Sequence, residues 1–158
     1  MTSSPAVRRL NHAVLYVRDA GRSARFYADA FGFVVAAEVG NGAAVFMRAG
    51  ETENHHDLGL FSLGANAPGP ERGRAGLYHL AWEVDTIQDL AAMRERLVAM
   101  DALVGESDHG VSKSLYGKDP DGIEFEVLWT VPRSDWGKYE REAVVQPLDL
   151  DAALARWG

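Results

Sequence analysis

Apolar and polar positions along the chain follow two periods, one of two residues and one of three to four. Strands are predicted where a run is apolar or follows the two-residue period and ends at glycine, proline or charged residues. Helical spacing occurs twice, first at Ala24, Tyr27, Ala28 and Phe31, and then at Ile87, Leu90, Met93 and Leu97. The predicted strands cover 10–17, 34–39, 43–47 and 57–63 in the first half, and 77–84, 103–106, 112–116 and 123–129 in the second.

The two halves repeat the same order of elements. His12 and His79 each lie in the first strand of a half and are 67 positions apart. The strand-to-helix boundaries at Asp19 and Thr86 are separated by the same 67 positions. This repeat predicts an α+β fold of two tandem β-α-β-β-β modules, forming a curved, half-open barrel-like mixed sheet with the helices outside.

The same pattern divides the chain into five segments. Glycine, proline and alanine concentrate between the modules, which predicts a loop there. The last segment carries Trp136, Tyr139 and a short helix predicted at 150–157. We expect this segment to pack on a module or on a partner in a dimer. The segments are a leader at 1–9, the first module at 10–64, a linker loop at 65–76, the second module at 77–130 and a tail at 131–158.

Composition narrows the classes of function. The 158 residues carry 16 Lys+Arg and 23 Asp+Glu, a formal net charge of −7, and 47% of them are hydrophobic. This balance predicts a sizeable core and disfavours nucleic acid and anionic membranes as partners. No apolar run approaches the roughly 20 residues of a membrane span, and the start has no apolar signal segment. The expected location is therefore the cytoplasm.

Cysteine is absent, so any metal must be held by histidine and carboxylate. His12 and His79 hold equivalent positions, and the two-residue period places each on the strand face opposite the apolar residues. Glu124 and Glu126 share the corresponding face of the last strand, with Glu124 as a rim residue. These positions predict a metal site of His12, His79 and Glu126, and the alternative is a set of polar residues on an exposed sheet face.

These features resemble the vicinal oxygen chelate superfamily. The resemblance rests on the paired modules, the histidine in the first strand of each, and Asp119-Pro-Asp-Gly122 ahead of Glu126. It covers about 10–129 and implies that His12, His79 and Glu126 are the metal ligands. The superfamily includes glyoxalases, fosfomycin-resistance proteins, bleomycin-binding proteins and extradiol catechol dioxygenases.

Two segments are similar to the dioxygenase branch. Asp108-His109-Gly-Val-Ser112 and Tyr116 resemble the stretch whose His and Tyr line the substrate pocket, with two additional residues before Tyr116. Tyr116 precedes Glu126 by ten residues, as in that branch. His55-His56-Asp57 resembles the segment that bears the acid–base histidine, which implies this role for His56 rather than His55. The alternative for this segment is the polar start of a strand.

The resemblance implies an extradiol dioxygenase that opens a catechol-type aromatic diol with O₂ at Fe(II), and Mn(II) fits the same ligands. His56 would move a proton, while Tyr116 and His109 would hydrogen-bond the substrate oxygen. Glyoxalases usually draw a fourth ligand from the position equivalent to Gly59, so glyoxalase chemistry is disfavoured. The substrates would be a small aromatic diol and O₂, and a homodimer is expected. Two alternatives remain. One is another metal-dependent enzyme of the superfamily, such as a glyoxalase-like lyase, an isomerase or a thiol transferase. The other is a non-enzymatic protein that binds an aromatic drug.

Overall fold

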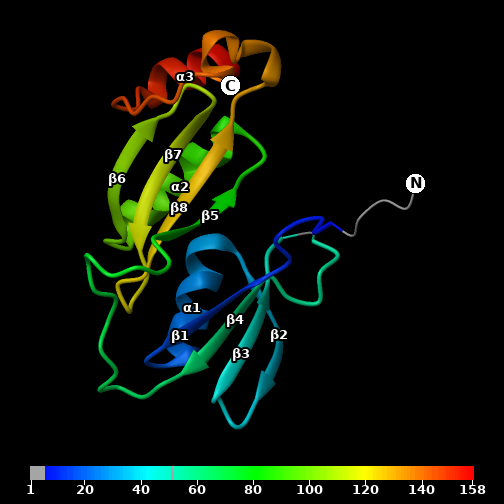
Figure 1. Cartoon of the computed structure of the whole chain (residues 1–158), viewed down its shortest axis with the longest axis vertical. Helices are drawn as coiled ribbons and strands as arrows, with labels where there is room; N and C mark the ends of the chain where they lie inside the picture. Colours follow the sequence, from blue (N-terminus) through cyan, green and yellow to red (C-terminus); the bar gives the residue numbers. More distant parts are fainter. Residues whose placement is uncertain (1–5, 51) are drawn as a thin grey trace. The chain divides into compact units, whose positions relative to one another are not determined.

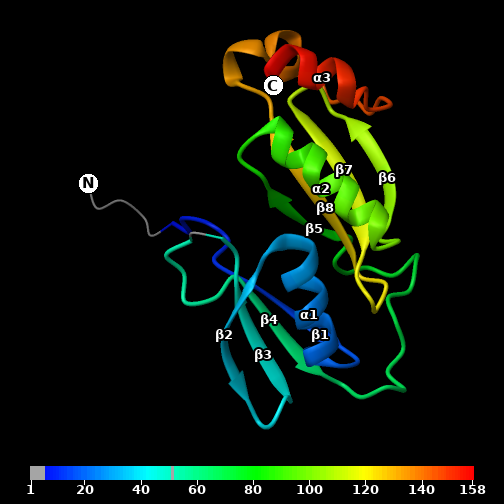
Figure 2. The same cartoon turned by 180° about the vertical axis from the view of Figure 1, so that it is seen from behind.

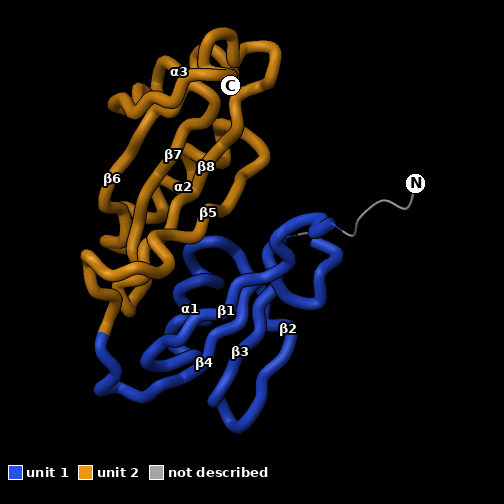
Figure 3. Tube along the Cα trace, viewed as in Figure 1, with its two compact units in different colours: residues 1–68 blue, residues 69–158 orange. Residues whose placement is uncertain are grey.

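The computed structural model describes residues 6–50 and 52–158, so the first five residues of the predicted leader lie outside the described residues. The chain divides into two compact units, unit 1 at Met1–Pro68 and unit 2 at Gly69–Gly158 (Figure 3). Each unit contains one four-stranded sheet, and its elements follow the order β-α-β-β-β. The predicted α+β fold of two β-α-β-β-β modules is therefore confirmed.

Unit 1 is a mixed sheet covered on one face by a helix (Figure 1). The sheet order is β1-β4-β3-β2, with β1 parallel to β4 and the other neighbours antiparallel. Leu15, Val17 and Tyr27 are buried between sheet and helix, whereas Val14 and Tyr16 are exposed, as the two-residue period predicts. The elements are β1 (Ala13–Val17), α1 (Ala20–Phe31), β2 (Val34–Val39), β3 (Ala44–Arg48) and β4 (Leu58–Ser62).

Unit 2 repeats this topology with the sheet order β5-β8-β7-β6, and α2 covers one face of its sheet (Figure 2). Its elements are β5 (His79–Glu83), α2 (Ile87–Ala99), β6 (Leu103–Asp108), β7 (Ser112–Lys118) and β8 (Glu124–Thr130). Two 3₁₀ turns, η1 (Arg133–Asp135) and η2 (Gly137–Glu140), then lead to α3 (Leu150–Trp157), which contacts α2. Within 6–50 and 52–158, every helix is too short or too polar to cross a bilayer.

Strand register reproduces the 67-residue repeat inside the sheets. Val14 pairs with Gly59 between β1 and β4, and Ala81 pairs with Glu126 between β5 and β8. Both members of the second pair lie 67 positions after those of the first. Gly59 is therefore the structural counterpart of Glu126, so this position of unit 1 carries no carboxylate.

Both long helices begin at the predicted strand-to-helix boundaries. The Asp19 carboxylate accepts a hydrogen bond from the Arg22 amide at 2.7 Å and caps α1. At α2, Thr86 and Asp89 form a reciprocal capping box, with each side chain accepting from the other residue's amide. Gly32, with φ +71°, ends α1 in the left-handed conformation that favours glycine.

Two strands begin later than the sequence predicts. The strand predicted from Leu10 begins at Ala13, and the one predicted from Leu77 begins at His79. Leu10, Leu77 and Tyr78 are all exposed, and none of them lies within a strand. In both places the apolar run in the sequence is longer than the hydrogen-bonded strand.

Gly117 of β7 gives a test of packing in unit 2. A Cβ at this position would clash with the ring of Phe125, which is 1% exposed, and would lie 2.8 Å from the Ala102 carbonyl oxygen. We expect Gly117→Ala to lower the free energy of unfolding in urea by about 1–3 kcal/mol. Gly105→Ala in β6 is the matched control, because its Cβ meets only ordinary contacts near 3.9 Å. Equal stability of the two variants would contradict this packing.

Candidate metal centre and its surroundings

Two predicted ligands meet on one face of the unit 2 sheet. His79 opens β5 and Glu126 lies on the neighbouring strand β8, so the parallel register brings both side chains to the same face. The His79 Nε2 is 3.1 Å from the Glu126 Oε2, and Glu126 is 8% exposed. The His79 Nδ1 is buried without a hydrogen-bond partner among the described residues. An imidazole nitrogen and a carboxylate oxygen that converge in this way fit a divalent cation such as Fe(II) or Mn(II).

Tyr116 connects this pair to His109. The Tyr116 hydroxyl lies 2.8 Å from the His109 Nε2 and 3.3 Å from the Glu126 Oε1. The His109 Nδ1 is 2.9 Å from the Val144 carbonyl oxygen, which only accepts, so Nδ1 carries a proton. A neutral His109 then accepts from Tyr116 through Nε2. Because a phenol has one proton, Tyr116 donates either to His109 or to Glu126, but not to both.

Tyr116 is a neutral phenol at neutral pH. Burial, and then the negative charge of Glu126 and its hydrogen bond, raise the pKa of Tyr116 to about 12. The hydroxyl is therefore available as a hydrogen-bond donor, and its oxygen retains lone pairs that can accept.

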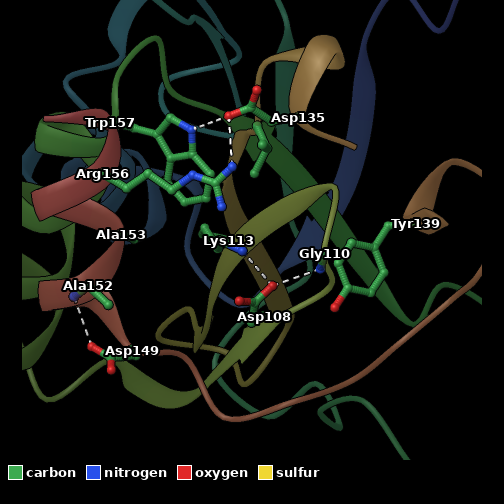
Figure 4. Close-up of a pocket in the computed structure, with 11 residues that line it drawn as sticks. Asp108, Gly110, Lys113, Asp135, Tyr139, Asp149, Ala152, Ala153, Arg156 and Trp157 are labelled. Carbon is green, nitrogen blue, oxygen red and sulfur yellow. Dashed lines mark hydrogen bonds and ion pairs between the residues drawn. The ribbon is translucent and has the colours of Figure 1, made fainter. Parts of the chain in front are cut away.

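The tail after β8 holds the segment that carries His109. Asp108 and Gln146 exchange two backbone hydrogen bonds, of 2.8 and 3.0 Å. The Tyr139 ring lies beside Gly110 (Figure 4), where a Cβ would collide with that ring. Gly110 has φ +78°, and its amide donates to the Asp108 carboxylate at 2.7 Å. The tail thus fixes the backbone on both sides of His109.

A pocket of about 270 Å³ lies between this β6–β7 turn and the tail (Figure 4). Both of its cations are paired, since Lys113 Nζ is 2.6 Å from the Asp108 carboxylate and Arg156 is 3.2 Å from Asp135. The Asp135 carboxylate also accepts from the Trp157 indole at 2.8 Å. The Lys113 Nζ also lies 5.4 Å from the centroid of the Trp157 ring, which joins the tail to the strands, so these charged groups have a structural explanation.

His12 of unit 1 lies beside His56. Their ring centroids are 4.6 Å apart, and the His55 Nδ1 is 3.1 Å from the His56 Nδ1. His56 is half-buried, whereas His12 and His55 are exposed. Burial, and then the neighbouring His12 and His55, lower the pKa of His56, which favours the neutral imidazole. A neutral imidazole can accept a proton, as an acid–base residue must.

A chain of amides determines which nitrogen of His12 is free. The His12 Nδ1 lies 2.9 Å from the Asn11 Oδ1, so Nδ1 donates and Nε2 keeps its lone pair. The orientation of the Asn11 amide is fixed because its nitrogen donates to the Asn54 Oδ1 at 3.1 Å. Asn54 in turn donates to the Asp57 carboxylate at 2.6 Å and to the Asn11 carbonyl at 3.0 Å. This arrangement leaves the His12 Nε2 able to bind a metal.

Asp57 organises the loop that carries His55 and His56. Partial burial would raise the pKa of Asp57, but hydrogen bonds from the Ala49 amide, the Thr52 hydroxyl and the Asn54 amide outweigh it. The pKa of Asp57 is therefore lowered in the folded chain. The charged carboxylate stabilises the fold at pH values above its ordinary pKa, and this stability is lost as the pH falls through the lowered pKa.

The Asp57→Asn variant tests this interpretation. We expect its free energy of unfolding near neutral pH to be about 1–2 kcal/mol below that of the wild type, because three hydrogen bonds lose a charged acceptor. The difference in free energy of unfolding between the wild type and Asp57→Asn should narrow as the pH approaches about 3, since Asp57 itself becomes protonated there. Asp29→Asn removes an exposed carboxylate and is the control. A difference between wild type and Asp57→Asn that is independent of pH in urea unfolding would contradict the role of the charge.

A row of aromatic residues begins beside His56 in unit 1. The Phe46 ring contacts His56 at a centroid distance of 5.0 Å and Phe61 at 5.8 Å. The Tyr16 ring lies 6.5 Å from Phe61 and is 71% exposed. This face of the sheet therefore combines apolar rings with an acid–base group.

The structure brings together only some of the predicted site residues. His79, Glu126, Tyr116 and His109 form one connected group in unit 2, and His12, His55 and His56 form another in unit 1. In the described part of the chain, no cluster of three or more metal-ligating side chains converges. Sequence reasoning missed Asn11, Asn54 and the Val144 carbonyl. Asparagine beside a predicted ligand is a weak signal, and a backbone carbonyl has none.

Comparison with known proteins gives one family and several relatives. Residues 9–127 match the model of the Glyoxalase/Bleomycin resistance protein/Dioxygenase superfamily. The chain is 32% identical to the catechol-2,3-dioxygenase of Bacillus subtilis (strain 168), over 100% of this chain and 55% of that protein. It is 33% identical to biphenyl-2,3-diol 1,2-dioxygenase 3 of Rhodococcus globerulus, over 80% of this chain and 64% of that protein. The chain thus spans between about half and two thirds of these relatives.

A solved structure shares the fold. The glyoxylase/bleomycin resistance protein/dioxygenase domain from Frankia sp. EAN1pec superposes with a TM-score of 0.66 and 22% sequence identity. The match covers 80% of this chain and all of that domain.

Proposed function

Because this chain belongs to the Glyoxalase/Bleomycin resistance protein/Dioxygenase superfamily, we propose that it is a metal-dependent extradiol dioxygenase that opens an aromatic diol with O₂. The observation that carries the proposal is the convergence of His79 and Glu126 beside Tyr116. The names of the two curated relatives, a catechol and a biphenyl-diol dioxygenase, support the same class of reaction.

The proposed metal is Fe(II), and its proposed ligands are His12, His79 and Glu126. Mn(II) fits the same nitrogen and oxygen donors. When bound by these residues, the metal would supply the electron-transfer chemistry that lets O₂ react with the diol. Gly59, the counterpart of Glu126, adds no fourth ligand, and this supports an open site over a four-ligand, glyoxalase-like one.

The chain's own residues position the diol and move its protons. His56 takes a proton from a diol hydroxyl, because its imidazole is neutral and lies beside the ligand His12. Tyr116 hydrogen-bonds a substrate oxygen and is oriented by His109, whose Nδ1 is held by Val144. The rings of Phe46 and Phe61 offer an apolar surface to the aromatic ring of the substrate. The predicted homodimer remains a prediction.

Oxygen uptake tests the proposed function. Fe(II) is added anaerobically to the purified chain, a panel of aromatic diols is supplied, and O₂ consumption is recorded with the visible spectrum. We expect one O₂ consumed per diol, with a coloured ring-opened product. Tight binding of about one metal per chain without O₂ uptake would favour a non-oxygenase member of the superfamily. If the chain neither binds a metal nor consumes O₂, a protein that binds aromatic molecules without turning them over is favoured.

A further inference from the structure

Another pocket lies on the sheet face that carries His79 and Glu126. Its volume is about 490 Å³, which is within the range of small-molecule sites. The segment before β5 and the turn between β7 and β8 line it, together with Lys118 and Glu124 at the strand ends. Its charged lining residues are Glu71, Arg72, Arg74, Lys118 and Glu124.

Strand register places this pocket next to the candidate metal centre. Lys118 pairs with Glu124 across β7 and β8, and Tyr116 pairs with Glu126 two residues away. Residues two apart on a strand share a face and lie about 7 Å from each other. Tyr78 lines the pocket, and its ring centroid is 4.8 Å from that of His79. A ligand that spans the two places therefore needs only the length of a substituted aromatic ring.

The positive charges of this pocket are only partly neutralised. The Arg74 Nε is 2.7 Å from the Glu71 carboxylate, which satisfies both groups. Arg72 and Lys118 make no ion pair with any residue in 6–50 or 52–158, even though Lys118 faces Glu124 across the strands. Three cations and two carboxylates leave one excess positive charge here, on a chain whose formal net charge is −7. In the pocket beneath the tail, by contrast, Lys113 and Arg156 are both paired.

We propose that this pocket binds a carboxylate group of the substrate, so that the chain acts on acidic aromatic diols. The inference rests on the proposed function. A carboxylate placed across the ring from the diol extends from Glu126 toward Lys118, where Arg72 and Lys118 donate charge-assisted hydrogen bonds. One carboxylate neutralises the excess charge, while Glu124 repels a second, so the pocket favours a single negative charge.

A charge-matched pair of substrates tests the proposal. 3,4-Dihydroxybenzoate and its methyl ester differ in charge but hardly in shape. We expect kcat/KM of the Fe(II)-reconstituted chain to be about tenfold higher for the acid, and the combined Arg72→Gln and Lys118→Gln substitutions to remove this preference by raising KM for the acid. Arg141→Gln, an exposed arginine outside the pocket, is the control and retains it. Equal kcat/KM for acid and ester, or a preference that survives the double substitution, overturns the proposal.

A binding measurement separates this inference from the proposed function. If no diol of the panel, including these two compounds, is turned over, the proposed function fails, and benzoate added to the metal-free, ¹⁵N-labelled chain tests the pocket alone. We expect amide shift changes confined to 70–78 and 118–124, which the double substitution abolishes. No shift changes in these segments, or the same changes in the double variant, would refute carboxylate binding at this pocket.

Discussion

Replacing Glu126 by alanine is expected to abolish Fe(II) binding and, with it, diol-dependent O₂ uptake. Glu126 supplies the carboxylate of the ligand set, and its side chain meets His79 at 3.1 Å. Loss of an outer partner of a metal ligand costs 10–100-fold in affinity, so loss of the ligand itself should cost about 100-fold or more. Anaerobic titration calorimetry with Fe(II) measures the affinity, and an oxygen electrode measures the uptake.

Glu124→Ala is the matched control for this variant. Glu124 lies on the same strand face two residues earlier, and no ion pair joins it to His79 within the described residues. Glu124→Ala should keep the Fe(II) affinity of the wild type, because Glu126 is the proposed carboxylate ligand and Glu124 is not. Full Fe(II) affinity in Glu126→Ala, or equal losses in both variants, would show that the ligand assignment is wrong.

Replacing His56 by alanine is expected to lower kcat by about 10²–10⁴-fold, which is the usual contribution of a general acid–base residue. Fe(II) affinity should be retained, because His56 lies beside His12 but is not one of the proposed ligands. Steady-state O₂ uptake and anaerobic Fe(II) titration of the same preparation separate the two effects.

His55→Ala distinguishes the two adjacent histidines. The His55 Nδ1 lies 3.1 Å from the His56 Nδ1, but His55 is exposed and His56 is half-buried against Phe46. We expect His55→Ala to keep kcat within a few-fold of the wild type. A larger loss of kcat in His55→Ala than in His56→Ala would assign the acid–base role to His55 instead.

Local signals in the sequence were sufficient for most of the fold. The helix predicted at 150–157 agrees with α3, the strand-to-helix boundaries predicted at Asp19 and Thr86 agree with the observed helix starts, and the 67-residue repeat recurs in the strand register. Each of these depends on residues close together in sequence or on a strict period. The predicted strand starts at Leu10 and Leu77 were too early, because an apolar run does not reveal where backbone pairing begins.

The surroundings of the site were less predictable, because they depend on contacts between distant residues. Asn54 fixes Asn11 from 43 positions away, and the Val144 carbonyl orients His109 from 35 positions away. Any residue type can supply a backbone carbonyl, so the sequence around Val144 does not indicate that its carbonyl contacts His109. The pairing of His79 with Glu126, by contrast, follows from the repeat and the two-residue period of strands.

Analysis of the product formed under ¹⁸O₂ tests extradiol cleavage most directly. The Fe(II)-reconstituted chain is supplied with an aromatic diol under ¹⁸O₂, and mass spectrometry and NMR identify the product, with Glu126→Ala as the control. The proposed function predicts a ring opened beside the diol that contains both atoms of one O₂, and no such product from the variant. A product whose ring is intact, or O₂ consumed without ring opening, would contradict it.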